Sequence, residues 1–115
     1  MTISKIGQND IAHHLHPYTQ LRQFEKTGPL VITSGKGIEV FDENGKAYIE
    51  SMAGLWCTSL GFSESRLVEA AHKQLQTLPF YHSFTGKVPG RVPELVEQLT
   101  AMAPMKDSRV IFDIS

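Results

Sequence analysis

The sequence predicts an α/β fold, in which a small antiparallel sheet is followed by two helices and the start of a further strand. Residues 30–50 are rich in β-branched and aromatic side chains, which favour strands. Residues 63–78 and 93–102 carry apolar side chains at three- and four-residue steps, the spacing of an amphipathic helix. Residues 109–112 form a short apolar run typical of a buried strand. Strands that precede a run of helices indicate an α+β segment within such a fold.

The composition is that of an ordinary globular protein and limits the classes of partner. The 115 residues, of which 41% are hydrophobic and 20% charged, make at most one domain. A net charge of −1 gives no electrostatic reason to expect nucleic acid or an anionic membrane as a partner. Apolar runs are too short to cross a bilayer, and the first residues lack a secretory apolar region. Because the single cysteine, Cys57, excludes an internal disulfide, we expect a reducing, cytoplasmic setting.

Residues 1–29 are expected to form an N-terminal arm or a short helix. Their apolar side chains show no sustained period, and Pro17 disfavours helical backbone at the residue before it. The Thr-Gly-Pro sequence at 27–29 is a further break. Such an arm needs another surface to pack against.

Residues 30–62 are expected to form a three-stranded antiparallel meander and the loop that follows it. We expect the strands at 30–33, 37–41 and 47–49. Asn44-Gly45 supplies the positive φ values that hairpin turns require. Residues 34–37, Ser-Gly-Lys-Gly, are expected to form the earlier turn.

Residues 63–108 are expected to form two helices. Ser63 is the expected cap of the first helix, with Glu64 in its first turn, where a carboxylate favours the helix dipole. Leu78-Pro79 ends that helix. The second helix is expected to start near Pro93 and to stop at Ala103-Pro104. The apolar stripes consist of Leu67, Ala71, Leu75 and Leu78 in the first helix, and of Leu95, Val96, Leu99 and Met102 in the second.

Residues 109–115 are expected to begin a buried strand, with Arg109–Phe112 as its apolar part. That strand has no sheet in the sequence to join, so we expect an incomplete fold or a chain that pairs with another. The alternative is a compact domain in which the 30–50 meander is the sole sheet.

The sequence contains residues that could belong to a metal site, a phosphate-binding loop or a nucleophilic site. His13 and His16 could share a helix face, but no nearby carboxylate or thiolate completes a metal set, so no metal site is expected. The glycine pairs at 35–37 and 86–90 match neither phosphate-loop nor dinucleotide patterns. Cys57 has no activating base near it in the sequence, and no other nucleophile signature is present. No catalytic residue is therefore assigned.

Aromatic residues in predicted loops are the remaining candidates. Loop aromatics with a polar atom suit the wall of a largely apolar pocket, although packing in a core is the alternative. The set consists of Tyr18, Trp56, Phe80, Tyr81 and Phe84.

Four stretches of the sequence together resemble the N-terminal part of class III aminotransferases. They read AHHLHPYT at 12–19, GKGIEVFDENGKAYIESMAGLWCTSLGF at 35–62, EAAHKQLQTLPFYHSF at 69–84 and RVIF at 109–112. These enzymes are of fold type I and depend on pyridoxal phosphate. The sequence is most similar to the ω-transaminases, which move an amino group between amines or ω-amino acids and pyruvate.

The resemblance implies a fold, an assembly and five substrate-pocket residues. The arm and the small sheet would belong to the small domain, and residues 109–112 would be the first strand of the large-domain sheet. The active site would lie at a homodimer interface and take an amine donor and a keto acid acceptor. By the resemblance, Leu55 and Trp56 lie beside the external aldimine, Tyr18 borders the small pocket, and Tyr81 and Phe84 surround the substrate entrance, with Phe84 reaching the partner's site.

The resemblance also implies that the residues that hold the cofactor are missing. In the family the strand at 109–112 runs into an N-S-G-S-E-A-type turn that binds the cofactor phosphate, whereas Asp113-Ile114-Ser115 stands here. From this departure we expect a truncated or frameshifted chain, or one whose end has been altered. None of the lysines matches the Schiff-base motif, so cofactor-binding residues stay unassigned and we expect the isolated chain to be inactive. The alternative is a non-catalytic module that pairs with a full-length aminotransferase subunit.

Overall fold

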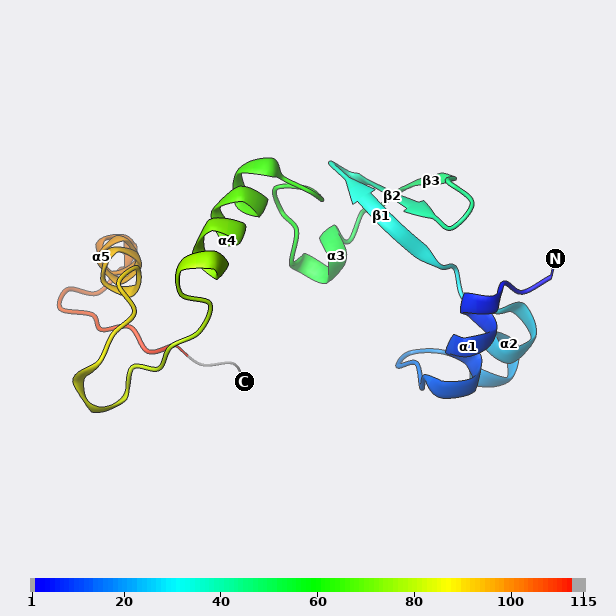
Figure 1. Cartoon of the computed structure of the whole chain (residues 1–115), viewed down its shortest axis with the longest axis horizontal. Helices are drawn as coiled ribbons and strands as arrows, with labels where there is room; N and C mark the ends of the chain where they lie inside the picture. The colour runs from blue at the N-terminus through cyan, green and yellow to red at the C-terminus, as the bar shows by residue number, and fades with distance from the viewer. Residues whose placement is uncertain (1, 113–115) are drawn as a thin grey trace. The chain divides into compact units, whose positions relative to one another are not determined.

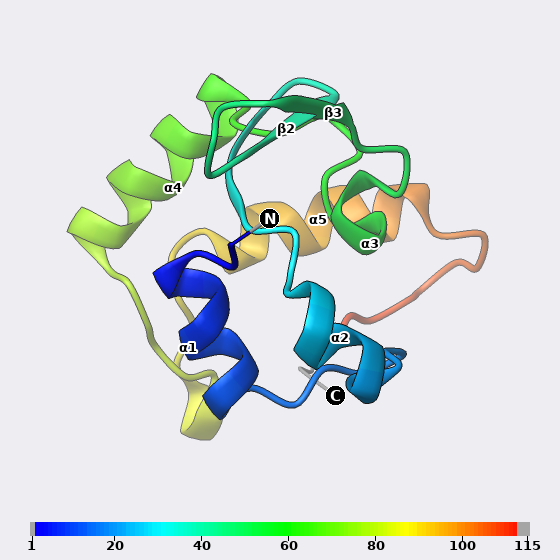
Figure 2. The same cartoon turned by 90° about the vertical axis from the view of Figure 1, so that its right-hand side faces the viewer.

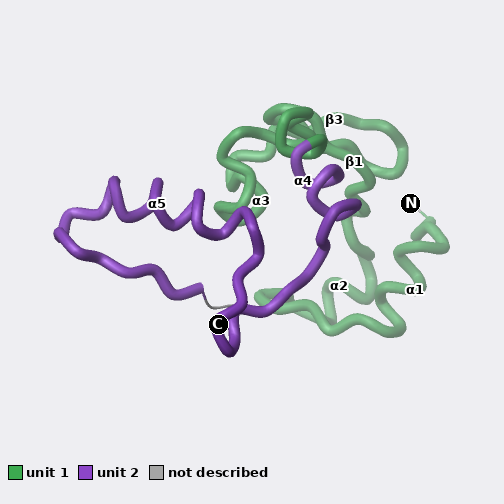
Figure 3. The backbone as a smooth tube through the Cα atoms, turned by 60° about the vertical axis from the view of Figure 1, so that its left-hand side comes forward, with its two compact units in different colours: residues 1–69 green, residues 70–115 purple. Residues whose placement is uncertain are grey.

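The computed structural model describes residues 2–112 and contains helices on either side of one small sheet along the sequence (Figure 1). The elements are α1 (Lys5–His13), α2 (Leu21–Thr27), β1 (Ile32–Lys36), β2 (Glu39–Asp42), β3 (Ala47–Ile49), α3 (Ala53–Trp56), α4 (Ser65–Thr77), the 3₁₀ turn η1 (Phe84–Gly86) and α5 (Val92–Met102). The chain divides into two compact units, residues 1–69 and 70–115 (Figure 3). The predicted α+β segment with a three-stranded antiparallel meander is confirmed.

The N-terminal arm contains two short helices, α1 and α2, joined by a loop (Figure 2). The Ser4 hydroxyl caps α1 by accepting a hydrogen bond from the Gly7 N–H at 3.1 Å. Gly7 is buried, and a Cβ there would lie 2.8 Å from a methyl carbon of Ile3, so a side chain at this position would force Ile3 to shift. The arm is more helical than the sequence analysis predicts, because the cap at Ser4 starts α1 well before Pro17 interrupts the chain.

The sheet has the strand order β1-β2-β3, and both pairs of neighbours are antiparallel. A bulge between Ile32 and Ser34 leaves Thr33 unpaired in the ladder, and its hydroxyl donates to the carbonyls of Phe41 and Asp42. The turn expected at 34–37 is wrong, since residues 34–36 belong to β1 and the chain reverses at Gly37, where φ is +60°. The β-type pairing therefore extends to Lys36, opposite Glu39.

The hairpin between β2 and β3 is closed by the carboxylate of Asp42. One oxygen accepts hydrogen bonds from the Asn44 N–H at 2.9 Å and the Lys46 N–H at 3.0 Å, and the other accepts from the Tyr48 hydroxyl at 2.9 Å. Only Gly45 in this turn has a positive φ, so the turn needs one left-handed residue and Asn44 is not the second. The Lys46 N–H hydrogen bond is the largest cause that holds the pKa of the Asp42 carboxyl below its usual value.

Helix α4 begins at Ser65, and the prediction of Ser63 as its cap is wrong. The Ser63 hydroxyl instead donates to the carbonyl of Gly35 at 2.7 Å, and Ser63 has a φ of +57°. Glu64 precedes the helix, and its carboxylate accepts hydrogen bonds from the N–H and the Nε–H of Arg66. The predicted end of this helix at Leu78-Pro79 is confirmed, since α4 ends at Thr77.

Helix α5 agrees with its predicted limits, with Pro93 in its first turn and Ala103 just beyond its end. Residues 109–112, the expected start of a strand, pair with no strand among the described residues. A strand needs a neighbour for its backbone groups, and the described residues contain one sheet, β1–β3. Residues 113–115, where the sequence departs from the expected phosphate-binding turn, lie outside the described residues.

Burial is sparse within the described residues. Val40 of β2 is the one buried large hydrophobic side chain among them, and Asp42 is the buried charged side chain. The apolar stripe of α4 stays exposed, with 56% of Leu67 and 55% of Leu75 accessible. No helix in the described part of the chain is long and apolar enough to cross a membrane.

Asp42→Asn should weaken the sheet, because the amide replaces an ionised acceptor of three hydrogen bonds with a neutral group that also carries donors. We expect a lower urea midpoint by circular dichroism, with Glu43→Gln, an exposed neighbouring carboxylate, as the matched control. Equal midpoints for the two variants would contradict this account of the hairpin.

The same carboxylate should make the stability of the sheet depend on pH. Its native pKa is lowered, so its contribution is present above the unfolded pKa of about 3.9 and is lost as the pH falls through the native pKa. We expect the urea midpoint of the unsubstituted chain to fall with acid in this range. The fall should be smaller in Asp42→Asn, and an unchanged acid dependence would assign it to other carboxylates.

Candidate functional site

The predicted site residues fall into three local groups. Tyr18 lies in the loop between α1 and α2, and Leu55 and Trp56 lie on α3, all within residues 1–69. Tyr81 and Phe84 follow α4 within residues 70–115.

The α3 segment is a left-handed turn. Ala53, Gly54, Leu55 and Trp56 have φ values of +49°, +59°, +59° and +70°. The Trp56 N–H donates to the carbonyl of Met52, and the Cys57 N–H to that of Ala53, both at 2.9 Å, so the spacing is that of one α-helical turn of the opposite hand. A left-handed helical conformation costs roughly 1–2 kcal/mol for each L-residue, so this turn needs support from outside itself.

The carboxylate of Glu50 provides that support. It accepts hydrogen bonds from the Met52 N–H at 3.1 Å and from the Gly54 N–H at 2.7 Å. The backbone N–H of Glu50 donates to the carbonyl of Ile38, which joins this residue to the sheet. Glu50 is not among the site residues predicted from the sequence. Its signal is an acid that directly follows a strand and precedes the small residues of a tight turn.

The left-handed turn exposes the two side chains that follow Gly54. Leu55 is 59% exposed and Trp56 is 82% exposed, so neither packs into a core of the described residues. Within the described residues, therefore, Trp56 does not show the core packing that the sequence left open as the alternative. Cys57 is a free and exposed thiol whose sulfur donates to the carbonyl of Leu55.

A stack of three rings follows helix α4. Tyr81 lies against His82 with ring centroids 4.7 Å apart, and His82 lies against Phe84 at 5.6 Å. His82 Nδ1 accepts a hydrogen bond from the Phe84 N–H at 3.2 Å, so the proton of the neutral ring is on Nε2. The structure thus brings Tyr81 and Phe84 together through His82, a residue that the sequence analysis does not select although it lies inside the aromatic run.

Tyr18 stands alone in the arm. Its φ is +48° and its side chain is fully exposed. Neither Tyr18 nor Trp56 belongs to a ring stack among residues 2–112. The arm aromatic and the turn aromatic are therefore presented to solvent by separate local structures.

The arm also contains a cluster of Asp10, His14 and His16. Both histidines hydrogen-bond to the Asp10 carboxylate, so the expectation that no carboxylate lies near the histidines is wrong. His13, which the sequence analysis pairs with His16, is not a member. Hydrogen bonding from His14 is the first cause that lowers the pKa of Asp10. The missed signal is the four-residue step from Asp10 to His14, which places both on one helix face.

The lysines are the side chains that could form a covalent bond to an aldehyde cofactor. A lysine that forms a Schiff base needs a desolvated or electrostatically adjusted amine. All lysines of the chain are exposed: Lys5, Lys26, Lys36, Lys46, Lys73, Lys87 and Lys106. What the chain does offer is a set of exposed aromatic side chains on fixed turns, which can form part of an apolar wall.

Comparison with known proteins places the chain among transaminases. Residues 22–115 match the family described as aminotransferase class-III. Vanillin aminotransferase from Capsicum annuum is 54% identical over 74 residues, which is 64% of this chain and 16% of that protein. Gamma aminobutyrate transaminase 1, mitochondrial, from Solanum lycopersicum is 46% identical over 92 residues, 80% of this chain and 18% of that protein.

A solved structure shows the same fold. The ω-transaminase from Pseudomonas jessenii in complex with PMP has 50% sequence identity and a TM-score of 0.84, and the match covers 92% of this chain and 23% of that one. The chain therefore spans less than a quarter of the length of these relatives.

Glu50→Ala should release the left-handed turn. Two hydrogen bonds to a carboxylate contribute about 3–6 kcal/mol, which is comparable to the roughly 3–6 kcal/mol of strain in Ala53, Leu55 and Trp56. Without the Glu50 carboxylate the backbone strain is no longer offset, so the turn should relax. We expect the near-ultraviolet circular dichroism of Trp56, the single tryptophan, to weaken and its fluorescence anisotropy to fall.

The matched control for this variant is Glu39→Ala, which removes an exposed carboxylate from β2 without touching the turn. Far-ultraviolet spectra check that the sheet persists in both variants. Unchanged Trp56 signals in Glu50→Ala would show that the turn holds its conformation without the carboxylate.

Proposed function

The chain belongs to the class-III aminotransferase family, and from this premise we propose that it is the N-terminal segment of a pyridoxal-phosphate-dependent transaminase. The proposed reaction moves an amino group from an amine or ω-amino acid to pyruvate or another keto acid. The names of the relatives support this reaction class, and the PMP complex of the Pseudomonas jessenii enzyme supports the cofactor.

The observation that carries the proposal is the left-handed turn with its exposed Leu55 and Trp56. Strained backbone persists where the surrounding structure holds it in place, and such strain gathers at binding and catalytic sites. Here the Glu50 carboxylate accepts two hydrogen bonds that hold the turn, and the turn keeps a bulky indole in solvent, where the indole gains no free energy from burial within the described residues. A substrate contact accounts for that arrangement.

The proposed role of the aromatic residues is to bind and orient the substrate. Leu55 and Trp56 form an apolar wall that limits the size of the amine substituent, and Tyr18 borders the smaller pocket. Tyr81 and Phe84 lie at the substrate entrance, with Phe84 directed to the partner's site in a homodimer. Such walls exclude water and fix the substrate. The cofactor, when bound, supplies the electron sink for the transfer.

We assign the parts of the chain accordingly. Residues 1–29 are the arm, residues 30–62 belong to the small domain, residues 63–108 lead into the large domain, and residues 109–115 start its sheet. The exposed lysines support inactivity of the chain by itself, because none is placed to anchor a cofactor. The proposed setting is the cytoplasm, although the tomato relative carries the word mitochondrial in its name.

A second candidate function is a non-catalytic module that pairs with a full-length aminotransferase subunit. The exposed apolar stripe of α4, which includes Leu67 and Leu75, favours it, because covering such a stripe with a partner is favourable in free energy. Mixing the chain with the Pseudomonas jessenii enzyme tests this role. Co-migration in size exclusion supports the module, and separate elution removes it.

The test of the transaminase proposal is a chimera. Residues 1–112 replace the matched segment of the Pseudomonas jessenii transaminase, and alanine formation from an amine and pyruvate is measured with added pyridoxal phosphate. We expect the chimera to form alanine and the isolated chain to form none. A folded, cofactor-loaded chimera without transfer would contradict the proposal.

Trp56→Gly in this chimera should change which amines react. Removing the indole opens the proposed wall, so kcat/KM for an amine with a bulky substituent should rise about tenfold or more, within the range that a pocket contact supplies. The value for a small amine should fall or stay level. Phe80→Ala, an exposed aromatic outside the proposed wall, is the control, and equal effects of both substitutions would contradict the role of Trp56.

A further inference from the structure

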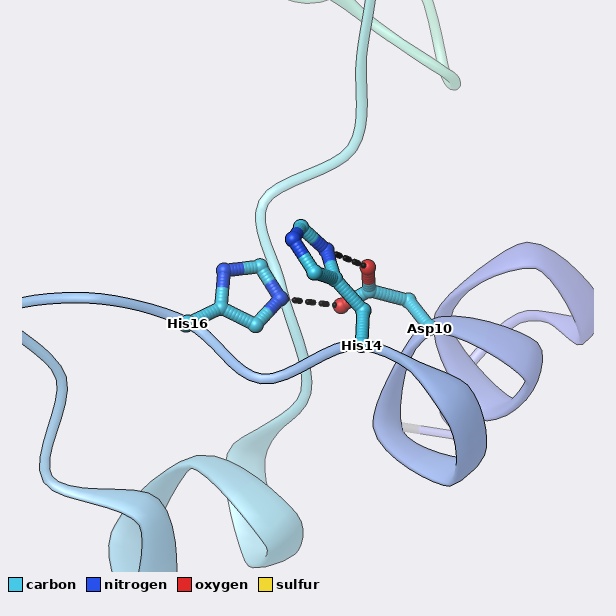
Figure 4. A group of neighbouring side chains, drawn as sticks. All are labelled: Asp10, His14 and His16. Atoms are coloured by element: carbon cyan, nitrogen blue, oxygen red, sulfur yellow. Dashed lines mark hydrogen bonds and ion pairs between the residues drawn. The ribbon is translucent and has the colours of Figure 1, made fainter.

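We propose that Asp10, His14 and His16 form a binding site for a divalent transition-metal ion such as Zn²⁺. Figure 4 shows the three side chains directed toward one another from the end of α1 and the loop that follows it. His14 Nδ1 lies 2.9 Å from one oxygen of Asp10, and His16 Nε2 lies 2.7 Å from the other. The candidate ligand atoms all lie within 4.8 Å of one another.

The donor set is one that zinc uses. Two imidazole nitrogens and a carboxylate oxygen are common zinc ligands, at about 2.0–2.2 Å from the ion. Two donors of a tetrahedral site are then about 3.4 Å apart, so the nitrogen–oxygen distances seen here must widen by about half an ångström. His14 is free to make that shift, because its side chain is 60% exposed and follows the last residue of α1.

The charge of the cluster also favours a cation. Among the described residues the ion-pair partners of Asp10 are the two imidazoles, and no lysine or arginine joins them. With both imidazoles neutral, the cluster carries the full negative charge of the carboxylate. A divalent ion compensates that charge and replaces the two hydrogen bonds with stronger ligand contacts.

Local structure holds the three residues in place before any ion arrives. The backbone N–H of His14 donates to the carbonyl of Asp10 at 2.9 Å, which fixes the four-residue step on one helix face. The His16 ring lies 4.5 Å from Phe24 of α2 and 4.1 Å from the His14 ring. Asp10 and His16 are only about a quarter exposed, so part of the loss of side-chain freedom on binding has already occurred.

The site has three protein ligands and leaves a position for water or another ligand. Its effect would be to tie the loop at 14–16 to α1 and so to stiffen the arm that carries Tyr18. In the competing account the cluster binds no metal, and its hydrogen bonds to Asp10 serve only to stabilise the loop. The two accounts differ in whether a metal binds with one-to-one stoichiometry.

The experiment is a calorimetric titration of the full 115-residue chain with Zn²⁺ after chelator treatment and removal of any affinity tag. We expect saturable binding of one ion per chain. His16→Gln should weaken it at least tenfold, whereas His13→Gln, which changes a histidine next to His14 that is not in the cluster, should leave it unchanged. The absence of saturable binding, or equal weakening by both substitutions, overturns the proposal.

A second measurement distinguishes the loss of a metal ligand from unfolding of the arm. The visible absorption of bound Co²⁺ reports nitrogen and oxygen ligands directly, and Asp10→Asn should reduce it while far-ultraviolet circular dichroism checks that α1 persists. A Co²⁺ spectrum that is unchanged in a folded Asp10→Asn variant also overturns the proposal.

Discussion

The turn that carries Trp56 depends on the hydrogen bonds that the carboxylate of Asp42 accepts. By accepting three hydrogen bonds from its own hairpin, it fixes the turn between β2 and β3 and therefore the register of β3. Glu50 directly follows β3, and its carboxylate reaches the turn that carries Trp56 because the end of that strand is held against Ile38. One buried acid thus positions a second acid, and the second acid positions the indole.

The left-handed turn shows how this small structure retains an unfavourable backbone. Three L-residues in that region oppose the turn, and two hydrogen bonds to a carboxylate offset them. The two contributions are of similar size, so the turn is neither rigidly locked nor free. Under the proposed function, a substrate that contacts Leu55 or Trp56 would need to add little free energy to select the observed conformation.

Much of the fold follows from local patterns, and the deviations share a physical cause. Side-chain type and spacing predict the strands near Phe41 and Tyr48 and the helix ends at Pro79 and Pro104. The sequence pattern does not show hydrogen bonds between distant residues. The Ser63 hydroxyl donates to the carbonyl of Gly35, 28 positions away, so Glu64 and not Ser63 accepts a hydrogen bond from the first turn of the helix. For the same reason the pattern misses Asp10 and Glu50, whose roles depend on where backbone N–H groups and imidazoles lie in space.

The two ends of the segment that bears Trp56 are tied to the same place. Glu50 donates to the carbonyl of Ile38, and Phe62 exchanges hydrogen bonds with Gly37, the adjoining residue. Residues 51–61 therefore form a compact loop that leaves and rejoins the sheet at one point, in the manner of an Ω-loop. Such a loop is exchangeable: a different sequence between these two attachments would present a different wall while the strands beneath keep their register. Under the proposed role of Trp56, substrate preference and the stability of the sheet can change independently, because the loop and the strands meet only at the attachments to Ile38 and Gly37.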